Sequence, residues 1–326
     1  MWLFLCYFVF TMEKQHRIEI KPYEQTFKQA WNEFVSEAKN ATFLFQRDFM
    51  EYHQDRFQDY SLMLWVDGVL TAVLPACREG SKLISHKGLT YGGFLVPFQC
   101  KFDLFQKLFL ELMHYLKKEG FTVLEIKSLP SVLGNTSNDE LAYLCTALKG
   151  SCLYNLSSII YLNKDKTISK SIYRNAKKAQ KSGITIVNSD DFTSFWNQLL
   201  VPRLEARYEK SPVHSLEEII FLKSKFPDEI VLKAAFYEGK MIAGTVLFYS
   251  KNFVKSQYIG SDPRFNKLGG IDLLHLTVLE ELSEDYFDFG SSIEPQTGEV
   301  NKGLLAWKEQ FGARSLAMPT YIFNIS

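Results

Sequence analysis

Several features are scarce in this sequence of 326 residues, and each absence removes a class of protein. The five cysteines are odd in number and show no C-x-x-C spacing, which predicts reduced thiols in a cytoplasmic protein rather than disulfides or a zinc site. The six histidines show no H-E-x-x-H spacing, so we expect no catalytic metal. The 37 basic and 37 acidic residues balance, which argues against a surface wholly devoted to nucleic acid, although a local basic patch stays open.

No apolar run is long enough to span a bilayer, but the chain opens with a short one. Residues 1–11 are apolar, follow no Lys or Arg and contain no small-residue cleavage site, so a secretory signal also fits poorly. Met12 follows and opens a charged stretch. We interpret residues 1–16 as an N-terminal extension in which Met12 is the true start, and a short membrane-touching anchor is the alternative.

What the sequence does contain is typical of a soluble protein with two domains. Hydrophobic residues make up 46% of the chain and charged residues 23%, as in globular proteins. The length exceeds that of one ordinary core and predicts about two domains. Aromatic residues are frequent, at 15%, and serve both large cores and grooves that stack ligands.

Periodicity predicts the same order of elements in both halves of the chain. Each half reads as helices, a strand meander with an acidic-Gly turn, a glycine-bearing strand, a long amphipathic helix and a further strand. The two turns are Asp67-Gly68 and Glu238-Gly239, and the glycine-bearing strands are 90–96 and 253–258 with Gly260 just after. The corresponding features lie nearly equal distances apart, which indicates a duplicated domain. We therefore predict domains at 17–163 and 164–326.

One segment near the C-terminus concentrates the features of a candidate site. Residues 303–314 (GLLAWKEQFGAR) predict a short helix with an apolar face, a Gly-Ala stop and a following strand. Lys308 lies inside this helix and follows Trp307. A lone lysine on a helix is usually a solvated surface residue, and this alternative stays open.

Five motifs in this chain resemble those of the FemAB family, the acyl and aminoacyl transferases that include the enzymes building peptidoglycan cross-bridges. They are YRNAKKAQKSGI at 173–184, IAG at 242–244, YIGS at 258–261, YFDFG at 286–290 and WKEQFG at 307–312. The resemblance covers the chain from about residue 17 and is strongest from Ile172 onward. It looks closest to smaller bacterial acyltransferases of unassigned substrate.

The resemblance implies a mixed α/β fold of two tandem GNAT-like domains, with the active site in the second. The chain departs from the family in two ways. It has no long coiled-coil arm of the kind that some cross-bridge enzymes use to hold transfer RNA. It also lacks a clean R/Q-x-x-G-x-G/A loop for the pyrophosphate of coenzyme A, and the nearest run is NKLGGI at 266–271. This run places two glycines at a helix N-terminus, where an anion could still bind.

The candidate site residues fall into three groups, and each has an ordinary structural alternative. Lys308 is the catalytic candidate by the resemblance, with Trp307 beside it and Asp262 as a base or substrate contact. The substrate-binding candidates are Arg203, Arg207, Tyr208, His214, Tyr258 and Ser261. The candidates for holding the donor's phosphates are Asn266, Lys267, Gly269 and Gly270. The alternatives are a turn-forming Asp262, a core Tyr258, helix-surface arginines and a plain glycine turn.

The resemblance implies transfer of an acyl or aminoacyl group to an amine, on a cell-envelope sugar or peptide precursor. We expect no tightly bound cofactor, with acyl-coenzyme A or aminoacyl-tRNA as co-substrate, no DNA partner and a cytoplasmic location with peripheral contact to the inner membrane surface. Five basic residues at 170–181 could touch transfer RNA, a nucleotide diphosphate or an anionic membrane, or could simply be solvated. A non-catalytic binding module that retains the fold is the alternative function.

Overall fold

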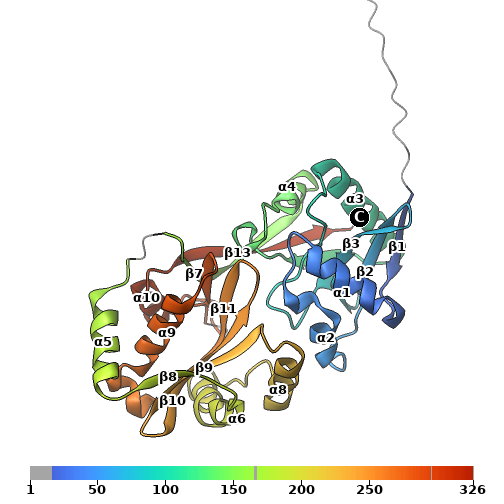
Figure 1. The fold of residues 1–326 in the computed structure, drawn as a ribbon. Coiled ribbons are helices and arrows are strands. Elements are labelled where there is room, and N and C mark those ends of the chain that lie inside the picture. Colours follow the sequence, from blue (N-terminus) through green and yellow to red (C-terminus); the bar gives the residue numbers. More distant parts are fainter. Residues whose placement is uncertain (1–16, 165–166, 295, 326) are drawn as a thin grey trace, which may run out of the picture.

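The computed structural model describes residues 17–164, 167–294 and 296–325, so the predicted N-terminal extension lies outside the described residues. The N-terminal half (residues 17–163) and the C-terminal half (residues 164–325) form two lobes that long strands connect (Figure 1). Within the described ranges, no helix combines the length and the apolar character needed to cross a bilayer.

Two sheets organise the described residues. The smaller sheet is antiparallel, with order β1 (Ile18–Pro22), β2 (Leu62–Val66) and β3 (Val69–Leu74). The larger sheet has ten strands in the order β4 (Cys77–Glu79), β5 (Lys82–Ser85), β6 (Val123–Lys127), β13 (Arg314–Asn324), β7 (Ser151–Tyr161), β12 (Tyr286–Ser291), β11 (Phe253–Ser261), β10 (Lys240–Tyr249), β9 (Ile230–Tyr237) and β8 (Thr185–Ser189). It runs through both halves and mixes parallel with antiparallel pairs.

The two halves exchange their last strands. β7, which ends the N-terminal half, pairs with β12 of the C-terminal half. β13, which ends the chain, pairs with β6 of the N-terminal half and also with β7. Figure 1 shows β13 crossing from one lobe to the other. The exchange makes the ten-stranded sheet continuous through both halves. The domain boundary between residues 163 and 164 stays a prediction.

The helices flank these sheets. They are α1 (Lys28–Glu37), α2 (Arg47–Met50), α3 (Phe102–Lys118), α4 (Glu140–Ala147), α5 (Lys170–Lys181), α6 (Phe192–Ser194), α7 (Val201–Tyr208), α8 (Leu216–Lys225), α9 (Gly270–Glu281) and α10 (Lys302–Gln310). A π-helical stretch at Phe195–Leu200 joins α6 to α7 without a break. α8 begins with a capping box formed by Ser215 and Glu218.

The two acidic-Gly turns have the same backbone conformation. Asp67 and Gly68 have φ angles of 49° and 85°, and Glu238 and Gly239 have φ angles of 49° and 76°. Two consecutive left-handed residues form the hairpin turn whose twist matches that of the flanking strands. The turns on which the predicted duplication rested are therefore equivalent in conformation as well as in sequence.

The predicted strand at 90–96 is wrong, because this segment makes isolated bridges rather than a strand. Gly92 bridges Ser128, and Leu95 bridges Val73. A Cβ on Gly92 would lie 1.6 Å from the carbonyl oxygen of Ser85. The glycine is needed because another part of the backbone passes here, and not because a ligand does.

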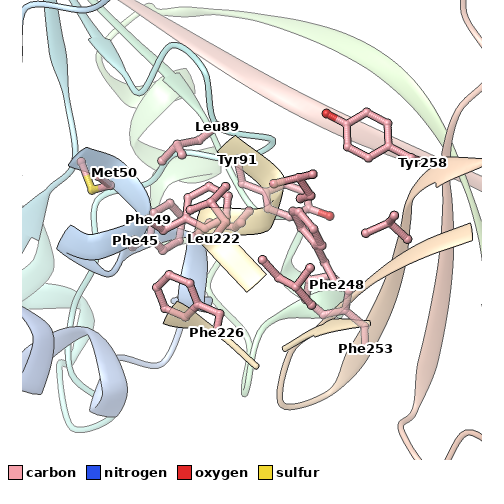
Figure 2. Packing of buried hydrophobic residues seen from close by; sticks show 14 of the residues in the cluster. Phe45, Phe49, Met50, Leu89, Tyr91, Leu222, Phe226, Phe248, Phe253 and Tyr258 are labelled. Carbon is pink, nitrogen blue, oxygen red and sulfur yellow. The ribbon is translucent and has the colours of Figure 1, made fainter. Parts of the chain in front are cut away.

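Aromatic side chains lock the two halves together. Phe43 of the N-terminal half packs against Phe226 and Phe248 of the C-terminal half, with ring centroids 5.3 and 5.4 Å apart. Phe49 contacts the same two rings at 5.9 and 6.1 Å (Figure 2). Each such pair contributes about 0.5–1.5 kcal/mol beyond the burial of its area. Any cavity that lies between the two halves is therefore bounded by tightly packed side chains.

Candidate active site

A cavity opens where two neighbouring strands of the C-terminal half part. β11 and β12 pair in parallel from Phe253 with Tyr286 to Lys255 with Asp288, and beyond this point each strand continues without the other. The resulting cavity has a volume of about 940 Å³, and residues of both halves line it. Its charged lining residues are Lys127, Arg203, Lys255 and Lys308, and no aspartate or glutamate of the described residues lines it.

Lys308 is the most deeply buried of these charges, with 1% of its surface exposed. The side chain of Asn301 caps α10 at its start and so fixes the helix that carries the lysine. The ammonium donates hydrogen bonds of 2.8 Å to the carbonyl oxygens of both Gly290 and Ser291, at the end of β12. The surface alternative for Lys308 is therefore wrong.

Burial lowers the pKa of Lys308 to about 7, with the charge of Lys255 acting in the same direction and that of Asp288 against it. Among the described residues the ammonium bonds two carbonyl groups and no carboxylate, and the charge of Asp288 offsets only part of the cost of burial. Such a lysine exchanges its proton near neutral pH, which suits a group that interacts with a reacting substrate.

A buried ion pair lies behind Lys308 and connects both halves. Asp288 is fully buried and accepts hydrogen bonds from Lys255 Nζ at 2.8 Å and from Tyr91 Oη of the N-terminal half at 3.2 Å. It also accepts from Ser157 Oγ and from the backbone N–H of Gly290. Burial raises the pKa of Asp288, but the charge and hydrogen bond of Lys255, together with the hydrogen bonds from Ser157 and Gly290, outweigh burial and hold the pKa below its usual range. The carbonyl of Gly290, which binds Lys308, is thus held by this network.

Trp307 is oriented by the first turn of α9. Its indole Nε1 donates a hydrogen bond of 2.9 Å to Asp272, and Asn175 of α5 donates one of 2.8 Å to the same carboxylate. The ring also packs edge-to-face against His275 at 5.2 Å, and Trp307 lines the cavity. The structure therefore places Trp307 and Lys308 at the same cavity through different anchors.

The structure places only one of the four predicted phosphate-binding residues at the cavity. Asn266 lines the cavity, whereas Lys267, Gly269 and Gly270 do not. Gly269 has a φ of 80°, and a Cβ there would lie 2.6 Å from the carbonyl oxygen of Asn175, so this glycine allows α5 to pack closely. The structure thus brings one of the four residues to the cavity.

A carboxylate already faces the N-terminus of α9, where a donor phosphate was expected. Asp272 lies in the first turn of the helix and is 7% exposed. A negative charge at this end interacts favourably with the helix dipole. The same charge repels a phosphate group, so this helix end is poorly suited to bind one.

Arg203, Ser261 and Asn266 form one polar corner of the cavity. Arg203 donates a hydrogen bond of 3.0 Å to Ser261 Oγ, and Ser261 Oγ lies 3.5 Å from Asn266 Oδ1. All three residues line the cavity. Arg207 and Tyr208 lie in α7, but their side chains are outside the described part of the chain.

His214 and Tyr258 also line the cavity, and they form a bonded pair. The His214 Nδ1 atom lies 2.5 Å from Tyr258 Oη, which also accepts from the His214 backbone N–H at 3.2 Å. Burial lowers the pKa of His214 to about 3, so the ring is neutral, and burial raises the pKa of Tyr258. This pair offers the cavity polar atoms without charge.

Asp262 does not line the cavity. It caps the short 3₁₀ helix Pro263–Leu268 and pairs with Arg264 at 2.6 Å and with Lys240 at 3.2 Å. The hydrogen bond from Arg264 holds the pKa of this carboxyl far below its usual range. A carboxylate with such a low pKa is a weak base at neutral pH, so the geometry favours its structural alternative.

Sequence reasoning missed the lining residues of the N-terminal half and the partners of Asp288. Lys127, Gly88, Leu89 and Thr90 line the cavity, although they belong to the other half of the chain. Lys127 ends a strand that also carries Glu125, so its charge alone was not a distinctive signal. Nothing local in the sequence indicated which cavity it would reach.

Known proteins share the fold of this chain at low sequence identity. No protein-family model and no curated protein sequence matches it. Among solved structures it is similar to FemX, at 12% identity over 94% of this chain and 97% of that chain, with a TM-score of 0.69. It is also similar to L-PGS from Bacillus licheniformis, at 12% identity over 93% of each chain, with a TM-score of 0.55.

A third similar structure is the C-terminal domain of a putative lysylphosphatidylglycerol synthetase from Agrobacterium fabrum. Its identity is 11% over 78% of this chain and 81% of that chain, and its TM-score is 0.52. These likenesses, the mixed sheet and the parted strands confirm the predicted FemAB-like, GNAT-type α/β fold. At this identity they establish the fold alone.

Proposed function

We propose that this protein is an N-acyltransferase that moves an acyl or aminoacyl group from an activated ester or thioester to an amine. The observation that carries the proposal is the buried ammonium of Lys308 in a large cavity where β11 and β12 part. The fold shared with FemX supports it.

Lys308 is positioned to stabilise the charge that develops during acyl transfer. The amine nitrogen attacks the donor carbonyl carbon, and negative charge gathers on the carbonyl oxygen. The C–O or C–S bond to the carrier then breaks, and the proton lost by the amine goes to the leaving group or to water. An ammonium group has three N–H donors, and two of them bind Gly290 and Ser291, which leaves one for the oxyanion.

The cavity favours an amine that arrives uncharged. The lining contains no carboxylate of the described residues that could serve as general base, and His214 is neutral and weakly basic. Four cationic side chains would also disfavour a protonated amine. The acceptor would therefore shed its proton to water before or during the attack.

For the donor we favour an aminoacyl ester of transfer RNA over acyl-coenzyme A. Asp272 occupies the helix N-terminus that would otherwise suit a pyrophosphate. α5 carries five exposed basic side chains and borders the site, because its Asn175 binds Asp272 and through it Trp307. A basic helix face of this kind suits a nucleic-acid backbone.

For the acceptor we propose an amine on a sugar or peptide precursor of the cell envelope, processed in the cytoplasm near the inner membrane surface. The name lysylphosphatidylglycerol synthetase describes a protein that makes a lysyl derivative of a membrane lipid, which is compatible with this setting. The alternative, a binding module without catalysis, predicts that Trp307 and Lys308 face no cavity. Both residues line one, which counts against that alternative.

A transfer assay with two donors tests the proposal. The chain from Met12 would be incubated with aminoacyl-tRNA or with acyl-coenzyme A and a panel of amino sugars and envelope peptides, and products would be detected by mass. We expect aminoacyl transfer from tRNA to one amine class. Transfer from coenzyme A alone would reverse our choice of donor. Absence of transfer from both donors with folded protein would contradict the proposed function.

A further inference from the structure

Lys127 is a cation of the cavity that the proposed chemistry does not use. It ends β6 in the N-terminal half and lines the same cavity as Lys308. Its backbone position is fixed, because its carbonyl oxygen accepts the N–H of Gly92 at 2.5 Å. Its neighbours on the strand, Leu124 and Ile126, face the core, which directs Lys127 to the other side of the sheet.

The ammonium of Lys127 has no acidic partner among the described residues. No ion pair within 4.0 Å and no side-chain hydrogen bond involves it. Glu125, on the same face of β6, makes no ion pair with it either, and the carboxylate of Asp288 is taken by Lys255. A half-buried lysine is normally paired, because removing its charge from water is costly.

The positive charges around Lys127 also favour a bound anion. Burial lowers the pKa of Lys127, and the charge of Lys255 lowers it further. Lys255 acts in the same way on Lys308. Three ammonium groups thus crowd one cavity whose described lining holds no carboxylate, and an anion placed among them would relieve this repulsion.

We propose that Lys127 binds an acidic group of the acceptor, a phosphate or a carboxylate, so that the acceptor is an anionic amine. The acid would lie at the N-terminal side of the cavity beside Thr90 and Gln257, which bond each other at 3.4 Å. The amine would extend toward Lys308. Apolar side chains such as Leu44, Phe57 and Leu89 line the same side and would contact the body of the ligand.

This inference deepens the proposed function by naming the class of acceptor, but its test does not need catalysis. Inorganic pyrophosphate and succinate would be titrated into the protein by calorimetry at equal, low ionic strength. The variants would be Lys127→Gln, Lys127→Arg and the control Lys82→Gln, which removes an exposed lysine from neighbouring β5. Both Gln variants change the net charge equally.

We expect at least one of the two anions to bind, and Lys127→Gln to weaken it by about tenfold or more, the loss of one charge-assisted hydrogen bond. Lys127→Arg keeps the charge and should retain most of the affinity, while Lys82→Gln should match the wild type. Binding of pyrophosphate alone would identify a phosphate, and binding of succinate alone a carboxylate. Unchanged affinity in Lys127→Gln, or no binding of either anion to the wild type, would overturn the inference.

The outcome is independent of the transfer assay. If Lys127→Gln weakens anion binding while neither donor supports transfer, the anion-binding site is supported and the proposed function is contradicted. If transfer occurs but Lys127→Gln does not change anion binding, the proposed activity is supported and the role of Lys127 in selecting the acceptor is contradicted.

Discussion

The two halves carry a similar but not identical order of elements, and they differ most where their central strands meet. In the C-terminal half, β11 and β12 part after Lys255 and Asp288, and the cavity opens there. In the N-terminal half, β5 and β6 pair up to Ser85 and Ile126, and the backbone of Gly92 then bridges Ser128. The notch, the space between two central strands beyond their last paired residues, is therefore open in the C-terminal half. In the N-terminal half it is filled by the backbone around Gly92.

The helix that precedes the last strand of each half, α4 before β7 and α10 before β13, also differs between the halves. Lys308 of α10 precedes Arg314, the first residue of β13, by as many residues as Cys145 of α4 precedes Ser151, the first of β7. Both side chains are buried, but Cys145 belongs to an apolar core cluster whereas Lys308 lines the cavity. Equivalent positions thus hold a packed thiol in one half and a charge in the other.

This comparison indicates how the halves divide their tasks. The N-terminal half has this space filled by its own backbone, and it contributes residues to the cavity of the C-terminal half. Tyr91, in the segment that fills its notch, bonds Asp288 of the C-terminal half. We interpret the filled half as a supporting wall and the open half as the site of reaction.

The largest effect should come from breaking the buried ion pair that supports the open half. Asp288→Asn leaves Lys255 buried without its counter-charge, which typically costs about 3–5 kcal/mol of unfolding free energy. Urea unfolding would measure the loss. The double variant Asp288→Asn with Lys255→Met should recover most of it, and failure to recover would show that the ion pair does not stabilise in this way.

A smaller but still large effect is expected from the filled half. Gly92→Ala places a Cβ 1.6 Å from a backbone oxygen that no side-chain movement can relieve, so we expect a loss of about 3 kcal/mol. Gly303→Ala is the control, because its Cβ meets no atom closer than 3.6 Å and the position is helical. That control should be neutral or stabilising by about 0.5–1 kcal/mol. Equal effects of the two substitutions would contradict the close backbone packing at Gly92.

The effect that is smallest per unit of the quantity varied concerns pH, and it sharpens the contrast at Lys308. Its pKa in the folded protein is lowered from 10.5 to about 7, so between these pH values the unfolded chain binds more protons than the folded one. Stability should therefore gain a contribution that rises with pH across this window, by at most about 1.4 kcal/mol per pH unit. The slope in this window should be flatter in Lys308→Met, and an identical slope would contradict the lowered pKa.

How much the sequence could predict depends on how far apart along the chain the interacting residues lie. The helix that carries Trp307 and Lys308 could be predicted because its motif is local and ends in a recognisable helix stop. The ionic partner of Asp262 was also local, since Arg264 follows two residues later, and its proximity could have warned against a catalytic role. The placement of Lys127 was not predictable, because it depends on how the two halves pack.

The exchange of last strands was hidden for a related reason. β7 and β13 are both strands of 11 residues, and their sequences do not show which strands each one pairs with. Only the packing of both halves decides the partner of each strand. Likewise, the carboxylate of Asp272 at the start of α9 is visible in the sequence, but its bond to Trp307 spans α9 and α10 and appears only in the fold.

The most direct test of the account is the turnover of Lys308→Met in the transfer assay, with Lys302→Met as control. Lys302 is an exposed lysine in the same helix, so both substitutions remove one charge from α10. Loss of one oxyanion donor typically lowers kcat by about 10²–10³-fold, and we predict this for Lys308→Met while Lys302→Met keeps wild-type turnover. Wild-type turnover in a folded Lys308→Met variant would contradict the central claim that the open half reacts through Lys308.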